Sequence, residues 1–192
     1  MKNLAAILLM FLTVTYVSGQ ELKKCDSTKY YWIIPSEDIS YTVKIIGEVS
    51  VTKQHNVLYV NNNALQYLIV DKKKYITDGT NPTELEILAN YVSSEINYMS
   101  GQYQAKLEAQ MQKAPLTGDK DAIVWWYKMP KGFNSEVTNQ LFASIIIDDK
   151  IFGVASPQFS NMKFKDVQDF LMDIISTLKK VTKKKKLKNI CN

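Results

Sequence analysis

The single histidine limits the kinds of catalysis that this sequence could support. His55 is the only histidine among 192 residues, and it lies between Gln54 and Asn56, where a polar turn is expected. A Ser-His-Asp or Cys-His mechanism would have to use it. Because loop side chains are usually solvated, we expect His55 to be exposed rather than a catalytic base. The sequence also contains no HExxH, GxSxG, Walker or dinucleotide-binding pattern.

The adjacent acids Asp148 and Asp149 are the most visible candidates for carboxylate chemistry. A glycosidase needs two carboxyl groups that face each other across a sugar, whereas neighbouring acids are also ordinary turn residues. Three further acids recur along a predicted helix, where a solvated face explains them better than a cation site: Asp166, Asp169 and Asp173. We therefore predict no metal and no cofactor, and keep a carboxylate-dependent hydrolase as an alternative function.

Lysine supplies every basic side chain, and its distribution along the chain is uneven. Residues 20–178 carry 16 lysines against 19 acids, whereas seven of the ten positions from Lys179 to Lys188 are lysine. This tail could attract anionic lipid, glycan or nucleic acid, or it could be a solubilising helix end. Four of its lysines are our candidates for such a surface: Lys183, Lys184, Lys185 and Lys186. Without arginine, sequence-specific nucleic-acid recognition is not expected.

Aromatic residues cluster at Trp125-Trp126-Tyr127, within a segment that reads as a strand. Alternation places the two tryptophans on opposite faces of a sheet. If helices cover one face only, one indole is exposed, and these residues form a candidate binding surface. If both faces are covered, they belong to the core, which the apolar neighbours Ile123 and Val124 favour.

The first nineteen residues have the features of a signal peptide. Lys2 supplies a positive start, residues 4–14 are almost entirely apolar, and residues 17–19 fit a cleavage site ahead of Gln20. The apolar stretch is shorter than the roughly twenty residues that a membrane-spanning helix needs. We predict an exported protein, periplasmic or secreted, whose mature chain begins at Gln20.

The two cysteines, Cys25 and Cys191, lie near opposite ends of that mature chain. In an exported protein they are candidates for a disulfide, which requires Cα atoms about 5.5 Å apart. The alternative is two free thiols in disordered termini. Lys23 and Lys24 precede Cys25 directly, where a lipid-modified cysteine would need small or apolar neighbours.

The periodicity of the sequence predicts strands first and helices later. Strands are expected at 30–34, 41–46, 48–53, 57–60, 65–70, 122–129, 137–147 and 151–155, with a hairpin turn at 61–63. Asn81, Pro82 and Thr83 offer a helix start, after which an apolar stripe continues for about thirty residues to Met111. A second amphipathic helix is expected to begin at Phe164 and to reach Leu178 or Val181.

These elements predict an α+β fold: an antiparallel sheet with a long central helix and a C-terminal helix packed on it, as in an α/β/α sandwich. We expect residues 20–181 to form one domain and residues 182–192 a basic tail. The element order resembles the PsbP-like superfamily, small exported α/β/α sandwiches in which a hairpin such as 141–155 leads into a C-terminal helix such as 164–181. The resemblance covers roughly residues 40–181. It implies a non-catalytic accessory or binding protein.

Together these features predict an exported, non-enzymatic binding or accessory domain that acts through protein or small-ligand contacts. Its expected partner is a protein or small ligand in the cell envelope or outside the cell, with an anionic surface as a further partner of the lysine tail. The alternatives are the carboxylate-dependent hydrolase and a periplasmic inhibitor or immunity-type protein.

Overall fold

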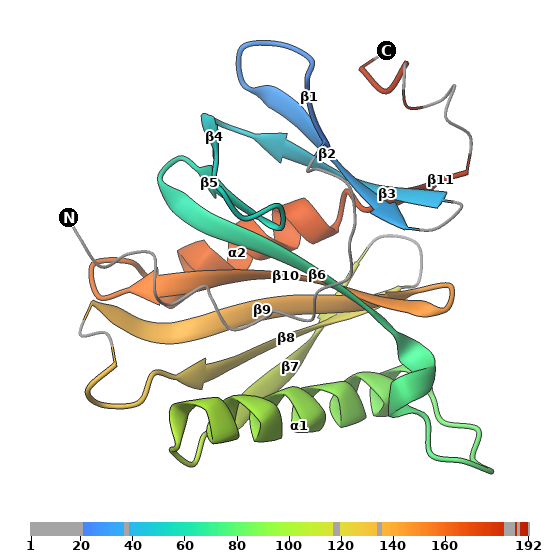
Figure 1. Ribbon diagram of the computed structural model, residues 1–192, viewed down its shortest axis with the longest axis vertical. Coiled ribbons are helices and arrows are strands. Elements are labelled where there is room, and N and C mark those ends of the chain that lie inside the picture. Colours follow the sequence, from blue (N-terminus) through green and yellow to red (C-terminus); the bar gives the residue numbers. More distant parts are fainter. Residues whose placement is uncertain are drawn as a thin grey trace.

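The computed structural model describes residues 21–36, 39–116, 120–133, 136–182, 187 and 189–191. Within them the chain forms two antiparallel sheets, two α-helices and a short 3-10 helix (Figure 1). The four-stranded sheet contains, in spatial order, β1 (Glu21–Lys24), β2 (Lys29–Ser36), β3 (Ile39–Ile46) and β11 (Lys179–Val181). The seven-stranded sheet contains, in spatial order, β4 (Val49–Val51), β5 (Val57–Val60), β6 (Asn63–Asp71), β10 (Lys150–Phe159), β9 (Val137–Ile147), β8 (Asp121–Lys128) and β7 (Ala109–Pro115). The helices are η2 (Lys72–Tyr75), α1 (Glu84–Tyr103) and α2 (Phe164–Ile175).

The centre of the seven-stranded sheet is buried on both faces. Its strands β8, β9 and β10 are rich in β-branched and aromatic residues, and most of their positions are buried. A strand that is apolar on both faces is stable only when both faces are covered. The α1 helix lies along one face, and α2 lies on the other (Figure 1).

One hydrophobic core lies between α1 and the sheet. Leu88, Tyr91 and Val92 of α1 pack toward Trp125 and Phe142. The helix begins close to the predicted start, at Glu84, because Thr83 and Glu86 form a reciprocal capping box: the Thr83 N–H donates to Glu86 Oε2 at 2.7 Å, and the Glu86 N–H donates to Thr83 Oγ1 at 3.3 Å.

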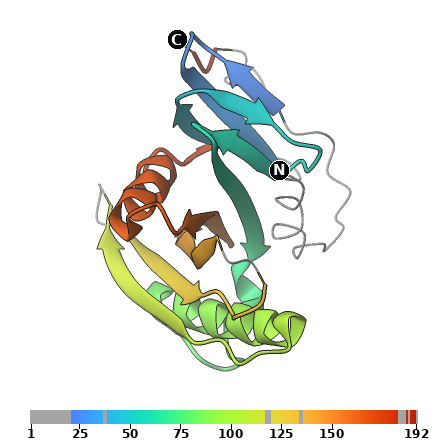
Figure 2. The ribbon, with the colours of Figure 1, turned by 90° about the vertical axis from the view of Figure 1, so that its left-hand side faces the viewer.

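A second core fills the space between the other face of this sheet, α2 and the four-stranded sheet. Val167 and Leu171 of α2 pack with Trp32 and Tyr41 of the four-stranded sheet and with Phe152 of β10. Figure 2 shows α2 beside both sheets. The result is a layered arrangement of helix, sheet and helix, with a smaller sheet beside the second helix, and the predicted α+β class is confirmed.

The long helix ends earlier than the sequence predicts. Gln104 adopts a left-handed conformation with φ of 49°, and the chain from Ala109 onward forms β7 rather than another helical turn. Leu107 is buried in the first core although it lies outside the helix, whereas Met111 is half exposed on the edge strand. The predicted stripe therefore continued across a helix boundary, because spacing alone could not separate a buried loop residue from a helical one.

The C-terminal helix is also shorter than predicted. It ends at Ile175, and Lys179–Val181 forms β11, which pairs with β3. The strand β1, which the sequence did not predict, pairs with β2. The predicted signal peptide, residues 1–19, lies outside the described residues. Among the described residues, neither α-helix is long and apolar enough to cross a bilayer.

Candidate functional site

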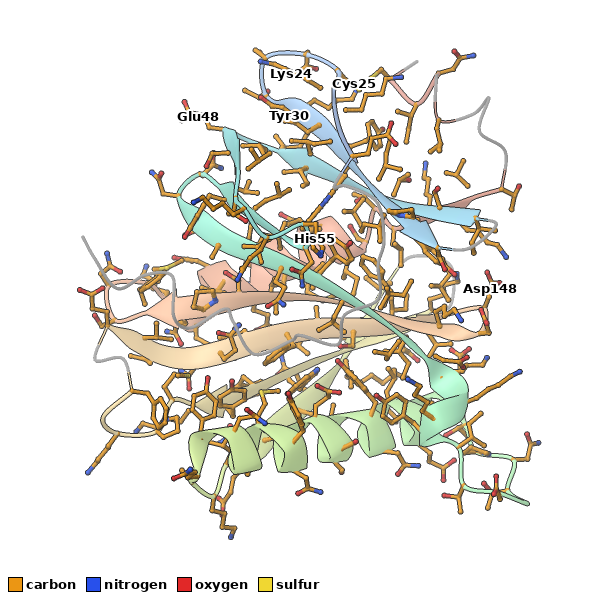
Figure 3. The ribbon with its side chains drawn as sticks, in the orientation of Figure 1. Lys24, Cys25, Tyr30, Glu48, His55 and Asp148 are labelled. Carbon is orange, nitrogen blue, oxygen red and sulfur yellow. A yellow bond between two sulfur atoms is a disulfide. The ribbon has the colours of Figure 1, made fainter. Side chains whose placement is uncertain are left out.

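The two cysteines join the ends of the described chain. Cys25 and Cys191 form a disulfide with a Cα–Cα distance of 5.3 Å, as the sequence predicted. Cys25 begins the turn between β1 and β2, where its N–H donates to the Lys29 carbonyl at 2.8 Å. Figure 3 shows Cys25 with Lys24 and Tyr30 at one end of the four-stranded sheet. The C-terminus is thereby attached to a strand turn of the body.

The lysine-rich tail is anchored at two points. On one side, β11 pairs with β3, with Val181 opposite Ser40. On the other side, Cys191 is bonded to Cys25, and the Lys23 ammonium donates to the Leu187 carbonyl at 3.1 Å. The candidate lysines Lys183, Lys184, Lys185 and Lys186 lie between these anchors and outside the described residues.

The hairpin turn between β9 and β10 contacts β11, the strand that forms the first anchor of the tail. Asp148 and Asp149 form this turn, with Asp148 at φ of 55°, a left-handed conformation that aspartate tolerates. The Lys180 ammonium lies 2.7 Å from Asp148 Oδ2, and this hydrogen bond raises the pKa of Lys180. Lys150 lies 3.1 Å from Asp149 and, through its hydrogen bond, lowers the pKa of that carboxyl.

Strand register gathers basic side chains on the outward face of the four-stranded sheet. Lys23 of β1 is opposite Tyr31 of β2, which is opposite Lys44 of β3, and Lys29 is opposite Ile46 in the next outward row. Directly opposed residues of antiparallel strands share a face. The intervening rows carry Trp32, Val43 and Ile45, which face the core. We call Lys23, Lys29, Tyr31, Lys44 and Ile46 the basic face.

The basic face opens toward one end of the sheet. Ile33 and Thr42, farther along the same outward side, are only 2% exposed each. Ile46, by contrast, is 55% exposed, and the Gly47 N–H that follows it donates to the Thr28 carbonyl at 2.8 Å. This open end is also the end that carries the disulfide, since Thr28 belongs to the turn that begins at Cys25.

The predicted aromatic surface lies mostly in the core. Trp125 is fully buried, stacks on Phe142 with ring centroids 3.8 Å apart, and donates from Nε1 to Ser144 Oγ at 3.2 Å. Tyr127 is 3% exposed. Trp126, on the other face, is half-buried against Phe164 of α2, with centroids 4.8 Å apart. Both faces of the sheet are covered, so Trp125 and Tyr127 belong to the core, the alternative that the sequence favoured.

The residues considered for catalysis do not converge. His55 is exposed in the turn between β4 and β5, and Figure 3 shows it well apart from Asp148. Asp148 and Asp149 each face a lysine, as described above. On α2, Asp169 is paired with Lys165 at 2.7 Å. Among the described residues, no group of three or more His, Cys, Asp or Glu is placed to hold a metal ion.

Sequence reasoning missed one partly buried carboxyl group on α1, that of Glu95. Burial raises the pKa of Glu95. Its helix neighbour Tyr91 is fully buried and lies edge-on to Tyr75 of η2, with centroids 5.2 Å apart. Burial, followed by the nearby charge of Glu95, raises the pKa of Tyr75 to about 12. The spacing of Tyr91 and Glu95 by four positions could have indicated a shared helix face, but the sequence does not show that Tyr75 returns to it.

Sequence comparison finds no protein-family model and no curated protein that matches this chain. Among solved structures, the fold is similar to the solution structure of cyanobacterial PsbP (CyanoP) from Synechocystis sp. PCC 6803, with a TM-score of 0.54. This chain has a PsbP-like fold. The likeness covers 80% of this chain and 93% of CyanoP at 12% sequence identity. The predicted resemblance is confirmed for the fold, and at this identity no residue role passes from CyanoP to this chain.

Proposed function

We propose that this chain is an exported, non-enzymatic accessory or binding domain that acts through contacts with a protein or small ligand. The observation that carries the proposal is the Cys25–Cys191 disulfide, which joins the two ends of the described chain. Disulfides of this kind persist in oxidising compartments outside the cytosol. The PsbP-like fold supports the same proposal, because the superfamily it resembles consists mainly of accessory and binding proteins.

The hydrolase alternative receives less support from the geometry. Asp148 and Asp149 are engaged by Lys180 and Lys150, and each points to a different lysine rather than to a shared substrate position. The half-buried carboxyl group of Glu95 lies near two tyrosines, Tyr75 and Tyr91. A glycosidase would need a second carboxyl group facing it across a sugar.

The basic tail contributes a second, weaker contact under this proposal. Its later lysines, 183–186, lie between two anchors on the body and would attract an anionic surface with about 1 kcal/mol per lysine, decaying over roughly 8 Å at physiological salt. Replacement of these four lysines with glutamine, with Cys191 retained, is expected to weaken binding to anionic vesicles at low salt. The melting temperature should stay the same. Equal vesicle binding by both proteins would rule out this contact.

Export and partner binding are tested in one preparation from the native host. Mass analysis of the protein recovered outside the cytosol should show a chain that begins at Gln20. Affinity capture from the native envelope fraction should then retain a defined partner, which the protein also binds after both are purified. Recovery of residues 4–14 in a membrane pellet would show that the leader is an anchor. Turnover of a glycan by the purified protein would instead favour the hydrolase.

A further inference from the structure

We propose that the basic face, Lys23, Lys29, Tyr31, Lys44 and Ile46, is a docking surface for an anionic lipid bilayer. It consists of described residues only and is independent of the lysines at 183–186. The inference rests on the proposed export, since it gives the exported domain a surface on which to work. It names a bilayer as the occupant because of the charge of the face and the apolar side chains within it.

The charge of this end of the molecule is positive after its acids are counted. Three lysines lie on the face, and Lys24 lies at the same end of the sheet but in the inward row, 5.6 Å from the centre of the Tyr30 ring. Asp26 faces its own turn, where Oδ1 accepts the Thr28 and Lys29 N–H groups at 2.9 and 2.7 Å. The other acids at this sheet are Glu21, on the outward row of Ile33, and Glu48, after the Gly47 turn. At this end of the sheet four lysines, Lys23, Lys24, Lys29 and Lys44, therefore stand against three acids.

Apolar and aromatic side chains stand between these lysines. Ile46 is 55% exposed and is paired with Lys29 across β2 and β3. Tyr31 of β2 is paired with Lys23 on one side and with Lys44 on the other. At a membrane surface, lysines meet anionic headgroups, while an exposed aliphatic side chain and a tyrosine ring enter the boundary with the acyl chains. A soluble polyanion would use the lysines but would gain nothing from Ile46.

The use of lysine rather than arginine also favours a bilayer over a polyanion whose phosphates have fixed positions. The chain has no arginine, so it lacks the planar group that binds phosphates in a bidentate, oriented way. Lysine is a point charge, which suits the diffuse negative potential of a lipid surface. A strand face that carries several such charges can contact more than one headgroup at once.

Two sets of matched variants test the proposal in the full chain with its disulfide intact. The first set compares K23Q/K29Q/K44Q with K72Q/K73Q/K74Q, which removes three lysines at η2, beside α1. The second compares I46S with L85S, an exposed leucine of α1. Binding is measured at low salt to phosphatidylcholine vesicles with and without phosphatidylglycerol, and to heparin as a soluble polyanion. Melting temperature and a non-reducing gel verify the fold and the disulfide of every variant.

The proposal predicts selective losses. Each lysine near an anionic membrane changes partitioning roughly fivefold, so K23Q/K29Q/K44Q should lose tenfold or more, whereas K72Q/K73Q/K74Q should lose little. The K23R/K29R/K44R variant should restore binding if the glutamine variant is poorly folded. I46S should weaken vesicle binding several-fold and leave heparin binding unchanged. Equal losses from both lysine sets, or no effect of I46S on vesicles, would overturn the bilayer assignment, and a cytosolic location of the native protein would overturn only the proposed export.

Discussion

The two sheets of this protein are held in place by different means. The centre of the seven-stranded sheet is apolar on both faces, and its fully buried Trp125 is stacked on Phe142 in the core beneath α1. The four-stranded sheet combines segments from both ends of the chain: β1, β2 and β3 from the first part, β11 from the last, and a disulfide at one end. One sheet is therefore stabilised mainly by burial, and the other depends on links between distant segments.

That difference places binding groups on the smaller sheet. A strand that is buried on both faces cannot present charged side chains, whereas the four-stranded sheet has one face toward the core and an outward side that is exposed at the end near Ile46. Lys23 and Lys44 occupy that outward side, on strands that also supply Trp32 and Val43 to the core. The same strands stabilise the fold and carry the proposed surface.

Of the substitutions considered, loss of Trp125 should lower the free energy of unfolding the most. Trp125→Ala removes the stacked ring and leaves a cavity in the seven-stranded sheet, so we expect the free energy of unfolding to fall by about 3–5 kcal/mol. Urea unfolding measures this change. Trp126→Ala, at a half-buried position on the opposite face, is the matched control and should cost less. If the two substitutions cost the same, the seven-stranded sheet is not stabilised mainly by its fully buried positions.

Loss of the disulfide should weaken the four-stranded sheet. A Cys25→Ser/Cys191→Ser variant should be less stable by about 2–5 kcal/mol, because a long loop is no longer closed in the unfolded chain. Hydrogen exchange at low denaturant should show a second effect, in which β1 and β11 lose protection while β8, β9 and β10 keep theirs. Uniform loss of protection across both sheets would mean that the two regions unfold as one unit.

The α1 cap should show a smaller, local effect. Thr83→Ala removes the hydroxyl that accepts the Glu86 N–H, and the expected loss of stability is about 1 kcal/mol. Thr80→Ala, in the loop that precedes the helix, is the control and should cost less. Thermal unfolding of both variants measures the difference. A loss from Thr83→Ala no larger than the control's would show that packing on the sheet, rather than the cap, fixes where α1 begins.

Glu95 should give the smallest effect, and one that depends on pH. Because burial raises the pKa of this acid in the folded chain, the folded state binds more protons than the unfolded state between the ordinary pKa, about 4.3, and the raised one. Stability falls as pH rises through that window. Glu95→Gln should therefore be more stable than the parent protein at neutral pH, and the gain should vanish in acid.

Denaturant midpoints across pH measure this difference. Glu84→Gln, at the exposed start of the same helix, is the control for the loss of a carboxylate. A Glu95→Gln protein that is less stable at neutral pH would show that the ionised carboxylate makes a favourable contact beside Tyr75 and Tyr91.

The sequence predicted those parts of the fold that local patterns determine. The Asn61 and Asn62 turn lies where left-handed residues were expected, and α1 begins within a few residues of its predicted start. The strand β7 was missed because Met111 continued a helical spacing, and β11 was missed because Lys179 and Lys180 have no strand pattern of their own. Their pairing depends on β3 and on the Asp148 turn, which are distant in sequence.

The candidate site was predictable only in part. The two cysteines and the lysine tail could be recognised from composition and position. The basic face could not, because Lys23, Lys29 and Lys44 share it only through the register of three strands. Trp125 and Tyr127 were ambiguous for a related reason, since whether a strand is covered on both faces depends on helices elsewhere in the chain.

The most direct test of the central claim is a peptide map of protein taken from its own compartment, with free thiols blocked before lysis and without reduction. We expect one linked pair of peptides, containing Cys25 and Cys191, that separates on reduction. This result would show that Cys25 and Cys191 meet at the four-stranded sheet in the native protein. Two blocked, unlinked cysteines would contradict the account, because the tail would then lack its covalent anchor to the four-stranded sheet.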